Sequence, residues 1–394
     1  TSLVANLGVL GYFKYTNFLF DLFSGTTGSP DRTFDIFLPV GISFFTFQSL
    51  SYTLDVYRGN LRPVDSLMDY AFYLSFFPQL VAGPIVRASE FIPQIHQPTI
   101  VTREMLGRGL FLVVTGLFKK AVISNYISLN FADRVFDAPT LYSGAENLLA
   151  IYAYALQIYC DFSGYSDMAI GIALMLGFHF SINFDSPYQS VNITEFWRRW
   201  HISLSGWLKD YLYISLGGNR KGNFRTYLNL MITMLLGGLW HGASLRFLLW
   251  GGMHGLALGA HKFFSEKTRD IRVAASLKPV LTALGVLLTF HFVCFCWIFF
   301  RAGDMELALA MISQVFTAFS PGILPQFIEG YRMVFLLMVT GYVLHFVPAT
   351  YEQRASDLVT RLPIAGKVLL LTAMIVLVIQ TKSAGIQPFI YFQF

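Results

Sequence analysis

Long apolar runs follow one another along this 394-residue chain, and they limit its fold more than any other feature. Each run approaches or falls short of the roughly 20 residues that a helix needs to cross a bilayer. Charged residues make up only 13% of the chain, against about a quarter in soluble domains, and the alternating segments of a membrane barrel are absent. The sequence therefore predicts a single all-α polytopic membrane domain over residues 1–394, with roughly nine to eleven transmembrane or re-entrant helices and additional amphipathic interfacial helices. The predicted segments are 2–24, 34–54, 67–86, 105–129, 146–160, 163–180, 225–240, 243–264, 279–300, 332–347 and 366–380.

Helix breakers interrupt two of these runs, at Leu38-Pro39-Val40-Gly41 and between Phe77-Pro78 and Gly83-Pro84. Non-helical backbone at membrane depth is tolerated only where protein or a water-filled cavity covers it. We therefore expect a packed bundle around a cavity, with these breaks in its wall. Paired glycines at 237–238 and 251–252 would let neighbouring helices approach closely.

Several classes of function lack support in the sequence. All three cysteines lie within apolar runs, so neither a disulfide framework nor a zinc knuckle is indicated. The formal net charge of +5 is modest and gives no signal for a nucleic-acid partner. A hydrolase elbow of the Gly-x-Ser-x-Gly type is missing, and His241, His254 and His261 lack the acidic neighbour and the spacing of a familiar metal site. We therefore predict neither a metal nor a bound cofactor.

One histidine, in Leu239-Trp240-His241-Gly242-Ala243, lies between two apolar arms that basic loops flank. The positive-inside rule places both loops on the cytoplasmic side. The first arm has about 16 residues and would extend about 24 Å, short of a hydrocarbon core of about 30 Å. We therefore expect His241 inside the membrane near the turn, where low polarity favours the neutral imidazole that a general base requires. The loops contain Arg220, Lys221 and Arg225 before the first arm, and Lys262, Lys267, Arg269, Arg272 and Lys278 after the second.

A more polar segment, residues 192–216, predicts an amphipathic helix at an interface or a cavity wall. Asn192 with Glu195 three residues later is a helix-start signature, and Glu195 with Arg199 forms an i,i+4 pair. His201 would lie on the apolar face of this helix. A purely interfacial anchor is the alternative interpretation. The apolar face would consist of Trp197, His201, Leu204, Leu208 and Tyr211.

Three acidic residues, Asp55, Asp161 and Asp167, occur in apolar surroundings. Each buried carboxylate costs about 2.5 to 3.5 kcal/mol on membrane-insertion scales. Pairing with Arg198, Arg199 or another cation would offset that cost. We therefore expect scaffold ion pairs at these positions rather than catalytic groups.

The polar segment and the His241 turn carry a family resemblance. The runs Glu195-Phe196-Trp197-Arg198-Arg199-Trp200-His201, Gly217-Gly218-Asn219-Arg220 and Trp240-His241-Gly242 closely resemble the membrane-bound O-acyltransferase family, and within it the alginate O-acetyltransferase branch. Residues 38–59 and the terminal Pro388-Phe389-Ile390-Tyr391-Phe392 resemble the same branch, so the match spans nearly the whole chain. Family members usually begin with further hydrophobic helices, and we expect these to be missing before Thr1. The resemblance implies helices around a central tunnel through which an acyl group is transferred.

The resemblance also implies roles for individual residues, with His241 matching the family's catalytic histidine and His201 its second tunnel histidine. A hydroxyl that attacks a thioester must lose its proton as the C–O bond forms, and neutral His241 can accept that proton. The donor implied by the branch is acetyl-CoA, a substrate that would enter from the cytoplasm and meet basic side chains with its phosphates. The positive-inside rule is an equally good explanation of those cations. The residues expected to bind substrate or donor are Trp200, Trp240, Asn219, Arg220, Lys221 and Arg225.

The implied function is O-acetylation of an extracytoplasmic polysaccharide such as alginate by a multi-pass protein of the bacterial inner membrane. The expected partners are the lipid bilayer, acetyl-CoA, a periplasmic SGNH-like acetyltransferase and the polysaccharide acceptor, with no nucleic acid. A transporter or flippase of a saccharide or lipid-linked intermediate is the alternative, because broken helices and intramembrane charges also build alternating-access sites. A non-catalytic scaffold for polysaccharide export is a third reading.

Overall fold

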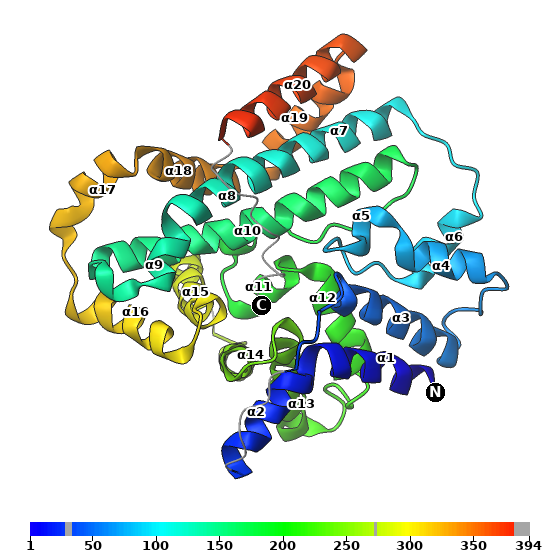
Figure 1. The fold of residues 1–394 in the computed structure, drawn as a ribbon, viewed down its shortest axis with the longest axis horizontal. Coiled ribbons are helices and arrows are strands. Elements are labelled where there is room, and N and C mark those ends of the chain that lie inside the picture. Colours follow the sequence, from blue (N-terminus) through cyan, green and yellow to red (C-terminus); the bar gives the residue numbers. More distant parts are fainter. Residues whose placement is uncertain (28–33, 272–273, 382–394) are drawn as a thin grey trace.

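The computed structural model describes residues 1–27, 34–271 and 274–381, and every regular element in those ranges is helical (Figure 1). The predicted all-α fold is confirmed. The predicted motif at Pro388–Phe392 and the basic residue Arg272 lie outside the described ranges. The first elements are α1 (Ser2–Leu10), η1 (Gly11–Tyr15), α2 (Thr16–Thr27), α3 (Ile42–Tyr57), α4 (Leu67–Ser75), α5 (Phe77–Leu80) and α6 (Ala88–Ile95). They are followed by α7 (Arg103–Leu117), η2 (Phe118–Ser124), α8 (Asn125–Ile127), η3 (Ser128–Ala132), α9 (Asp133–Asp137), η4 (Pro139–Leu141) and α10 (Gly144–Met175).

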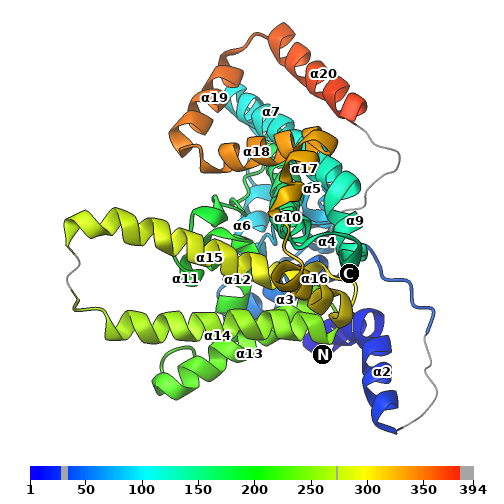
Figure 2. The ribbon, with the colours of Figure 1, turned by 90° about the vertical axis from the view of Figure 1, so that its left-hand side faces the viewer.

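The second half of the chain adds the elements that carry most of the predicted site. Figure 2 shows α14 and α15 as two long neighbouring helices, with α19 and α20 at the far edge of the molecule beside α7. The elements are η5 (Pro187–Gln189), α11 (Ile193–Arg199), α12 (Ile202–Trp207), η6 (Leu208–Tyr213), α13 (Gly222–His241) and α14 (Leu245–Lys267). After these come η7 (Ala275–Leu277), α15 (Lys278–Arg301), α16 (Met305–Thr317), η8 (Pro321–Ile323), α17 (Leu324–Gly330), α18 (Arg332–Phe346), α19 (Ala349–Arg361) and α20 (Ile364–Thr381).

Helices α7 and α10 lie side by side at the centre of the molecule (Figure 1). Two pairs of facing glycines allow this close approach. A Cβ added to Gly116 would stand 2.5 Å from the carbonyl oxygen of Gly164, and one added to Gly109 would stand 2.7 Å from that of Gly171. Small residues at helix contacts let backbones pack directly against each other, which matters where lipid provides no hydrophobic drive for association.

Helix α10 corrects the prediction of two separate segments with a break after residue 160, because it is one continuous helix of 32 residues. The two aspartates in the middle of this helix stay within it because lysines neutralise their charges. Lys120 donates a hydrogen bond to Asp161, and the Nζ of Lys119 lies 2.7 Å from Asp167 Oδ2. Both lysines come from η2, which continues α7 along the same interface. The expected scaffold ion pairs at these two aspartates are therefore confirmed, with lysines as the cations.

The start of α11 agrees with its sequence signature. The side chain of Asn192 accepts a hydrogen bond from the backbone N–H of Glu195 at 2.8 Å, and Arg199 Nη2 lies 2.9 Å from Glu195 Oε1. Such a side-chain cap satisfies a backbone donor that the first helical turn leaves without a partner. The predicted N-cap and ion pair are confirmed.

The predicted single amphipathic helix is wrong beyond Arg199, because the chain breaks there into α11 and α12. The break occurs at His201, whose φ of 44° is left-handed and ends the helical hydrogen-bond ladder. A distant segment takes the freed backbone groups: Asp185 N donates to Arg199 O at 3.0 Å, and Ile202 N donates to Asn183 O at 2.9 Å. Long-range pairing therefore outweighs local helix preference here and turns His201 into the interior.

Helices α13 and α14 form an antiparallel hairpin with His241 at the end nearest the turn, as predicted. A Cβ on Gly238 would stand 2.1 Å from Phe247 O, and a Cβ on Gly251 would stand 2.3 Å from Met234 O. These two glycines explain why the arms can pack so closely. The basic loops lie at the opposite end of the hairpin from the histidine.

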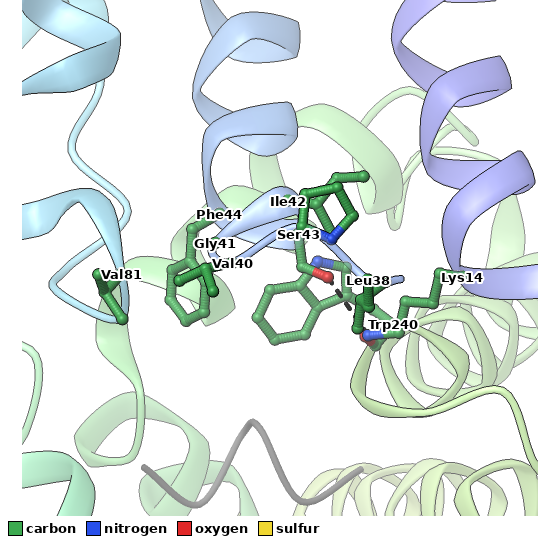
Figure 3. Close-up of a pocket in the computed structure, with 10 residues that line it drawn as sticks. Lys14, Leu38, Val40, Gly41, Ile42, Ser43, Phe44, Val81 and Trp240 are labelled. Atoms are coloured by element: carbon green, nitrogen blue, oxygen red, sulfur yellow. Dashed lines mark hydrogen bonds between the residues drawn. The ribbon is translucent and has the colours of Figure 1, made fainter. Parts of the chain in front are cut away.

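The two predicted helix breaks meet each other in the structure. Gly41, with a φ of 76°, lies so close to α5 that an added Cβ would stand 2.5 Å from Leu80 O. A small cavity of about 50 Å³ opens beside this contact (Figure 3). Its lining comes from residues 38–44, Lys14, Val81 and Trp240. Both breaks contribute to the lining of this hollow, while the expected bundle around a central cavity stays a prediction.

Three helical stretches in the described part of the chain are long and apolar enough to cross a membrane, and two sharply bent helix pairs raise that number to five. The prediction of nine to eleven elements included half-spans, and the remaining helices fall below the length or the hydropathy needed to cross alone. The polytopic membrane architecture follows from these apolar helices. The three stretches are Arg103–Asp137, Ala275–Arg301 and Ile364–Thr381; the pairs are Met305–Thr317 with Pro321–Gly330, and Arg332–Phe346 with Ala349–Arg361.

Candidate active site

His241, the last residue of α13, lies in a nest of aromatic rings, and only 4% of its surface is exposed. Its ring meets those of Trp250 from α14 and Phe300 from α15 edge to face, with both centroids at 5.1 Å. Three helices therefore fix the imidazole from different sides. The apolar walls exclude water, which strengthens any electrostatic interaction made inside the site.

His201 is completely buried, and a hydrogen-bond network defines its orientation. Asn183 Oδ1 accepts from the backbone N–H of Ser203 at 3.1 Å and lies 3.2 Å from His201 Nδ1. A backbone N–H can only donate, so the atom facing Ser203 is the amide oxygen and His201 Nδ1 carries the proton that it shares. In the neutral ring, Nε2 then holds a lone pair. Within the described part of the chain, Nε2 has no hydrogen-bond partner.

The indole of Trp240 joins the two histidines. Its ring centroid lies 5.0 Å from that of His241 and 6.1 Å from that of His201. Phe44 and Phe47 of α3 complete the surroundings, at 5.5 Å and 5.2 Å from Trp240. The structure thus brings together His201, Trp240 and His241, three of the residues singled out from sequence, although the first lies 39 and 40 positions before the other two.

Trp200 is buried beside His201, but its described contacts are with other aromatic side chains of the core. Its ring lies 5.6 Å from Phe196 in a stacked arrangement and 5.1 Å from both Phe184 and Trp297. These contacts fit a packing role at the break between α11 and α12. A role for Trp200 in substrate binding stays a prediction.

The predicted donor-binding cations lie far from His241, at the opposite end of α13. Asn219, Arg220 and Lys221 are exposed in a turn that precedes the helix. The 20 residues of α13 correspond to about 30 Å at 1.5 Å per residue. Arg225 differs from its neighbours because it is half-buried and donates to Leu216 O at 3.5 Å. Contact of these residues with a donor stays a prediction, and it requires a donor that reaches along the helix.

Two residues of the site were missed by sequence reasoning. Asn183 lies in an irregular segment between Ile182 and Phe184. A single amide side chain between two apolar residues is the one local feature that could have pointed to it. Lys14 donates to the carbonyl oxygens of Trp240 at 2.5 Å and His241 at 3.2 Å, across more than 220 positions of sequence. No local pattern reveals such a contact.

His254 of α14 lies in the same aromatic cluster as His241. Trp197 Nε1 donates to His254 Nδ1 at 3.3 Å, and the Trp250 ring lies 4.8 Å from the His254 ring. The structure therefore places it among packed rings rather than beside acidic groups. Among the described residues, no group of three or more His, Cys, Asp or Glu side chains is arranged to hold a metal ion.

Asp55 completes the set of acidic residues considered from sequence. Its carboxylate accepts a hydrogen bond from the hydroxyl of Tyr211 at 2.7 Å and lies in the contact between α3 and η6. Nearby, Arg87 and Asp210 form an ion pair at 2.6 Å. For Asp55 the expected ion pair is replaced by a hydrogen bond from a phenol, and this contact between two helical elements fits a scaffold role.

Comparison of this chain with known proteins shows which family it is similar to. Residues 62–303 match the membrane-bound O-acyltransferase family. A probable alginate O-acetylase of Pseudomonas aeruginosa is 44% identical over 318 residues, which cover 80% of this chain and 59% of that protein. A peptidoglycan O-acetyltransferase of Helicobacter pylori is 42% identical over 336 residues, covering 79% and 63%.

More distant similarity extends to other acyl groups. A teichoic acid D-alanyltransferase of Bacillus subtilis is 28% identical over 269 residues, covering 65% of this chain and 67% of that protein. The chain spans about three fifths of the length of the two O-acetylating relatives. The family match includes His201, Trp240 and His241, which the fold gathers at one point. The chain belongs to the membrane-bound O-acyltransferase family.

Proposed function

We propose that this protein is a membrane O-acetyltransferase that passes acetyl groups from cytoplasmic acetyl-CoA towards an extracytoplasmic polysaccharide. The observation that carries this proposal is the pair of buried histidines, His201 and His241, on either side of Trp240. Buried imidazoles are costly in apolar surroundings, and two of them at one point indicate chemistry rather than packing. Membership of an acyltransferase family supports acyl transfer as that chemistry.

In the proposed reaction, neutral His241 takes the proton of an acceptor hydroxyl as its oxygen attacks the thioester carbonyl carbon. The C–O bond forms, the C–S bond breaks, and the imidazolium returns the proton to the departing thiolate. General-base assistance of this kind contributes about 10² to 10⁴-fold. His201, with the Nε2 lone pair turned away from Asn183, would accept a hydrogen bond and orient the acceptor. The sequence of steps needs no covalent acyl-enzyme and no metal.

The names of the relatives support the choice of acetyl and of a cell-surface acceptor. One is named for alginate and another for peptidoglycan, while the more distant one transfers D-alanine to teichoic acid. An acceptor outside the cytoplasm and a donor inside it require transfer across the bilayer. We propose that a periplasmic SGNH-like acetyltransferase collects the acetyl group, that the polymer is alginate or a similar polysaccharide, and that the protein resides in the bacterial inner membrane.

The test is transfer by purified protein in lipid vesicles. The protein receives acetyl-CoA carrying a ¹⁴C-acetyl group on one side and oligosaccharide acceptors, with and without a periplasmic partner, on the other. We expect label in the acceptor fraction and free CoA thiol on the donor side in equal amounts. Release of thiol without labelled acceptor, or no turnover with any acceptor, would contradict the proposal.

A transporter or flippase is the second candidate, and the broken helices beside the cavity at Gly41 favour it. The two functions differ in the need for a base. A transporter would move labelled saccharide across the vesicle without acetyl-CoA and would keep that flux after His241→Ala. An acetyltransferase would show neither property.

A further inference from the structure

The C-terminal turn of α13 leaves four backbone carbonyls without partners in the helix, as every α-helix does. Each of the four nevertheless accepts a hydrogen bond. Gly242 N donates to Gly238 O at 3.4 Å, and the hydroxyl of Tyr15 donates to Leu239 O at 2.7 Å. Lys14 Nζ donates to the last two, at 2.5 Å for Trp240 O and 3.2 Å for His241 O. Three of the four bonds thus come from two neighbouring side chains.

Each of the three N–H groups of the Lys14 ammonium has a hydrogen-bond acceptor in this arrangement. It has three protons, and its third partner is Ser43 Oγ of α3 at 3.2 Å. Figure 3 shows Lys14, Ser43 and Trp240 lining the same cavity, with Lys14 close to Trp240. A cation at this end of a helix also interacts favourably with the helix dipole.

Few apolar side chains of this N-terminal segment are fully buried. Among the described side chains of residues 1–23, Leu10 is the only one that is buried. Lys14 and Tyr15 belong to η1, a single π-helical turn between α1 and α2, and such turns occur frequently at functional sites. The segment donates side-chain hydrogen bonds to α13, and those of Lys14 end on Trp240 and on His241, the proposed base.

We propose that Lys14 and Tyr15 are positioning residues for His241, holding the last turn of α13 so that the imidazole keeps its place beside Trp240. The proposal rests on the proposed function for the role of His241. It makes the N-terminal segment part of the active site, although the family match begins only at residue 62. Loss of either donor would remove hydrogen bonds that hold the last turn of α13 in apolar surroundings and would let the turn shift.

Lys14→Met removes the ammonium and keeps most of the length of the side chain. A displacement of about 1 Å at a reacting group can cost about 10²-fold. We therefore expect kcat to fall about 10 to 100-fold while the KM for acetyl-CoA stays within about twofold of the wild-type value. Lys14→Arg should recover part of kcat because a guanidinium can still donate to the carbonyls. Lys278→Met, at an exposed position, is the control and should match wild type.

Tyr15→Phe is the milder test for the case in which Lys14→Met fails to fold, as judged by its thermal transition. It removes one hydroxyl, and we expect kcat to fall about fivefold. Tyr12→Phe is its matched control, since Tyr12 lies three residues away in the same π-helical turn with its ring mostly exposed. Wild-type kcat in both Lys14→Met and Tyr15→Phe would overturn the proposal, as would an equal loss in Tyr12→Phe.

A readout without turnover separates this inference from the proposed function. Amine acetylation of the folded protein by an N-hydroxysuccinimide ester, followed by mass spectrometry, reports how accessible each lysine is. We expect Lys14 to react at least about tenfold more slowly than Lys278, and Ser43→Ala to raise its rate. If Lys14 reacts as fast as Lys278, it does not hold α13 and the inference fails. If Lys14 is protected but no acetyl transfer occurs, the contact stands and the proposed function fails.

Discussion

The two ends of α13 differ in burial and in charge. At its C-terminus, His241 is buried among rings from three helices, and its backbone is held by side chains from the start of the chain. At its N-terminus, Asn219, Arg220 and Lys221 are exposed on a turn whose glycines, Gly217 and Gly218, adopt positive φ angles. One end excludes water, and the other is open to it.

This difference separates two tasks that an acyl transfer imposes. Proton abstraction benefits from a fixed, dry site, because displaced water no longer competes with the base. Binding a large anionic donor benefits from an accessible cationic surface. Because α13 is about 30 Å long, the two tasks can take place at two well-separated points along the helix. Changes at the buried end should therefore affect kcat, and changes at the exposed end should affect KM.

The largest expected effect tests the buried end. His241→Ala should lower kcat about 10² to 10⁴-fold, because it removes the base and leaves the aromatic walls in place. Measurement of acetyl transfer in vesicles, together with the thermal unfolding midpoint, checks both parts. His291→Ala is the matched control, an exposed histidine on α15 that bonds Tyr152 instead. Transfer near the wild-type rate in His241→Ala would remove the proposed chemistry from this end of the helix.

Asn183→Leu should lower kcat about 10-fold or more, since it removes the acceptor that fixes the His201 ring and the proton on its Nδ1. Stability should fall by about 1 to 3 kcal/mol, because the Ser203 N–H loses its partner as well. Ser166→Ala is the control, since it breaks the bond to the other end of the same amide and spares the histidine. If the two variants lose kcat equally, the orientation of His201 is not what matters.

The α13–α14 packing offers a comparison between adjacent glycines. Gly251→Ala would place a Cβ 2.3 Å from Met234 O and should cost about 1 to 3 kcal/mol of stability. Gly252→Ala would meet only Leu235 Cδ2 at an ordinary 3.6 Å, so a gain of about 0.5 to 1 kcal/mol in helix preference should dominate. The unfolding midpoints of the two variants, measured in detergent with urea or heat, test this expected difference in stability. Equal midpoints would mean that the hairpin adjusts and does not fix His241.

Sequence predicted the features of this fold that arise locally. The cap at Asn192, the ion pair of Glu195 with Arg199 and the close packing at Gly238 and Gly251 are all confirmed. The position of His241 near the turn followed from two basic loops and the length of one arm. These signals are readable because each depends on residues a few positions apart or on a simple count.

Sequence failed where distant segments decide the outcome. The helix break at His201 depends on Asn183 and Asp185, which take over backbone bonds that a continuous helix would have kept. The opposite error occurred in α10, where Lys120 neutralises Asp161 and lets the helix continue. Pairing Lys14 with α13 requires the tertiary fold itself. The predicted central tunnel stays a prediction.

The smallest expected effect tests the exposed end of α13. Arg220→Gln combined with Lys221→Gln should raise the KM for acetyl-CoA about two to fivefold and leave kcat unchanged, because exposed charge pairs contribute about 0.2 to 1 kcal/mol each. The KM difference should shrink as salt is raised from low to about 0.15 M, where screening shortens the reach of surface charges. Lys267→Gln with Arg269→Gln makes the same charge change in the second basic loop, at the same end of the hairpin. If neither pair shifts KM, the cations serve membrane orientation alone. If both pairs shift KM alike, acetyl-CoA responds to the general positive charge at this end of the hairpin and not to Arg220 and Lys221 in particular, and the contrast between the two ends of α13 reduces to burial.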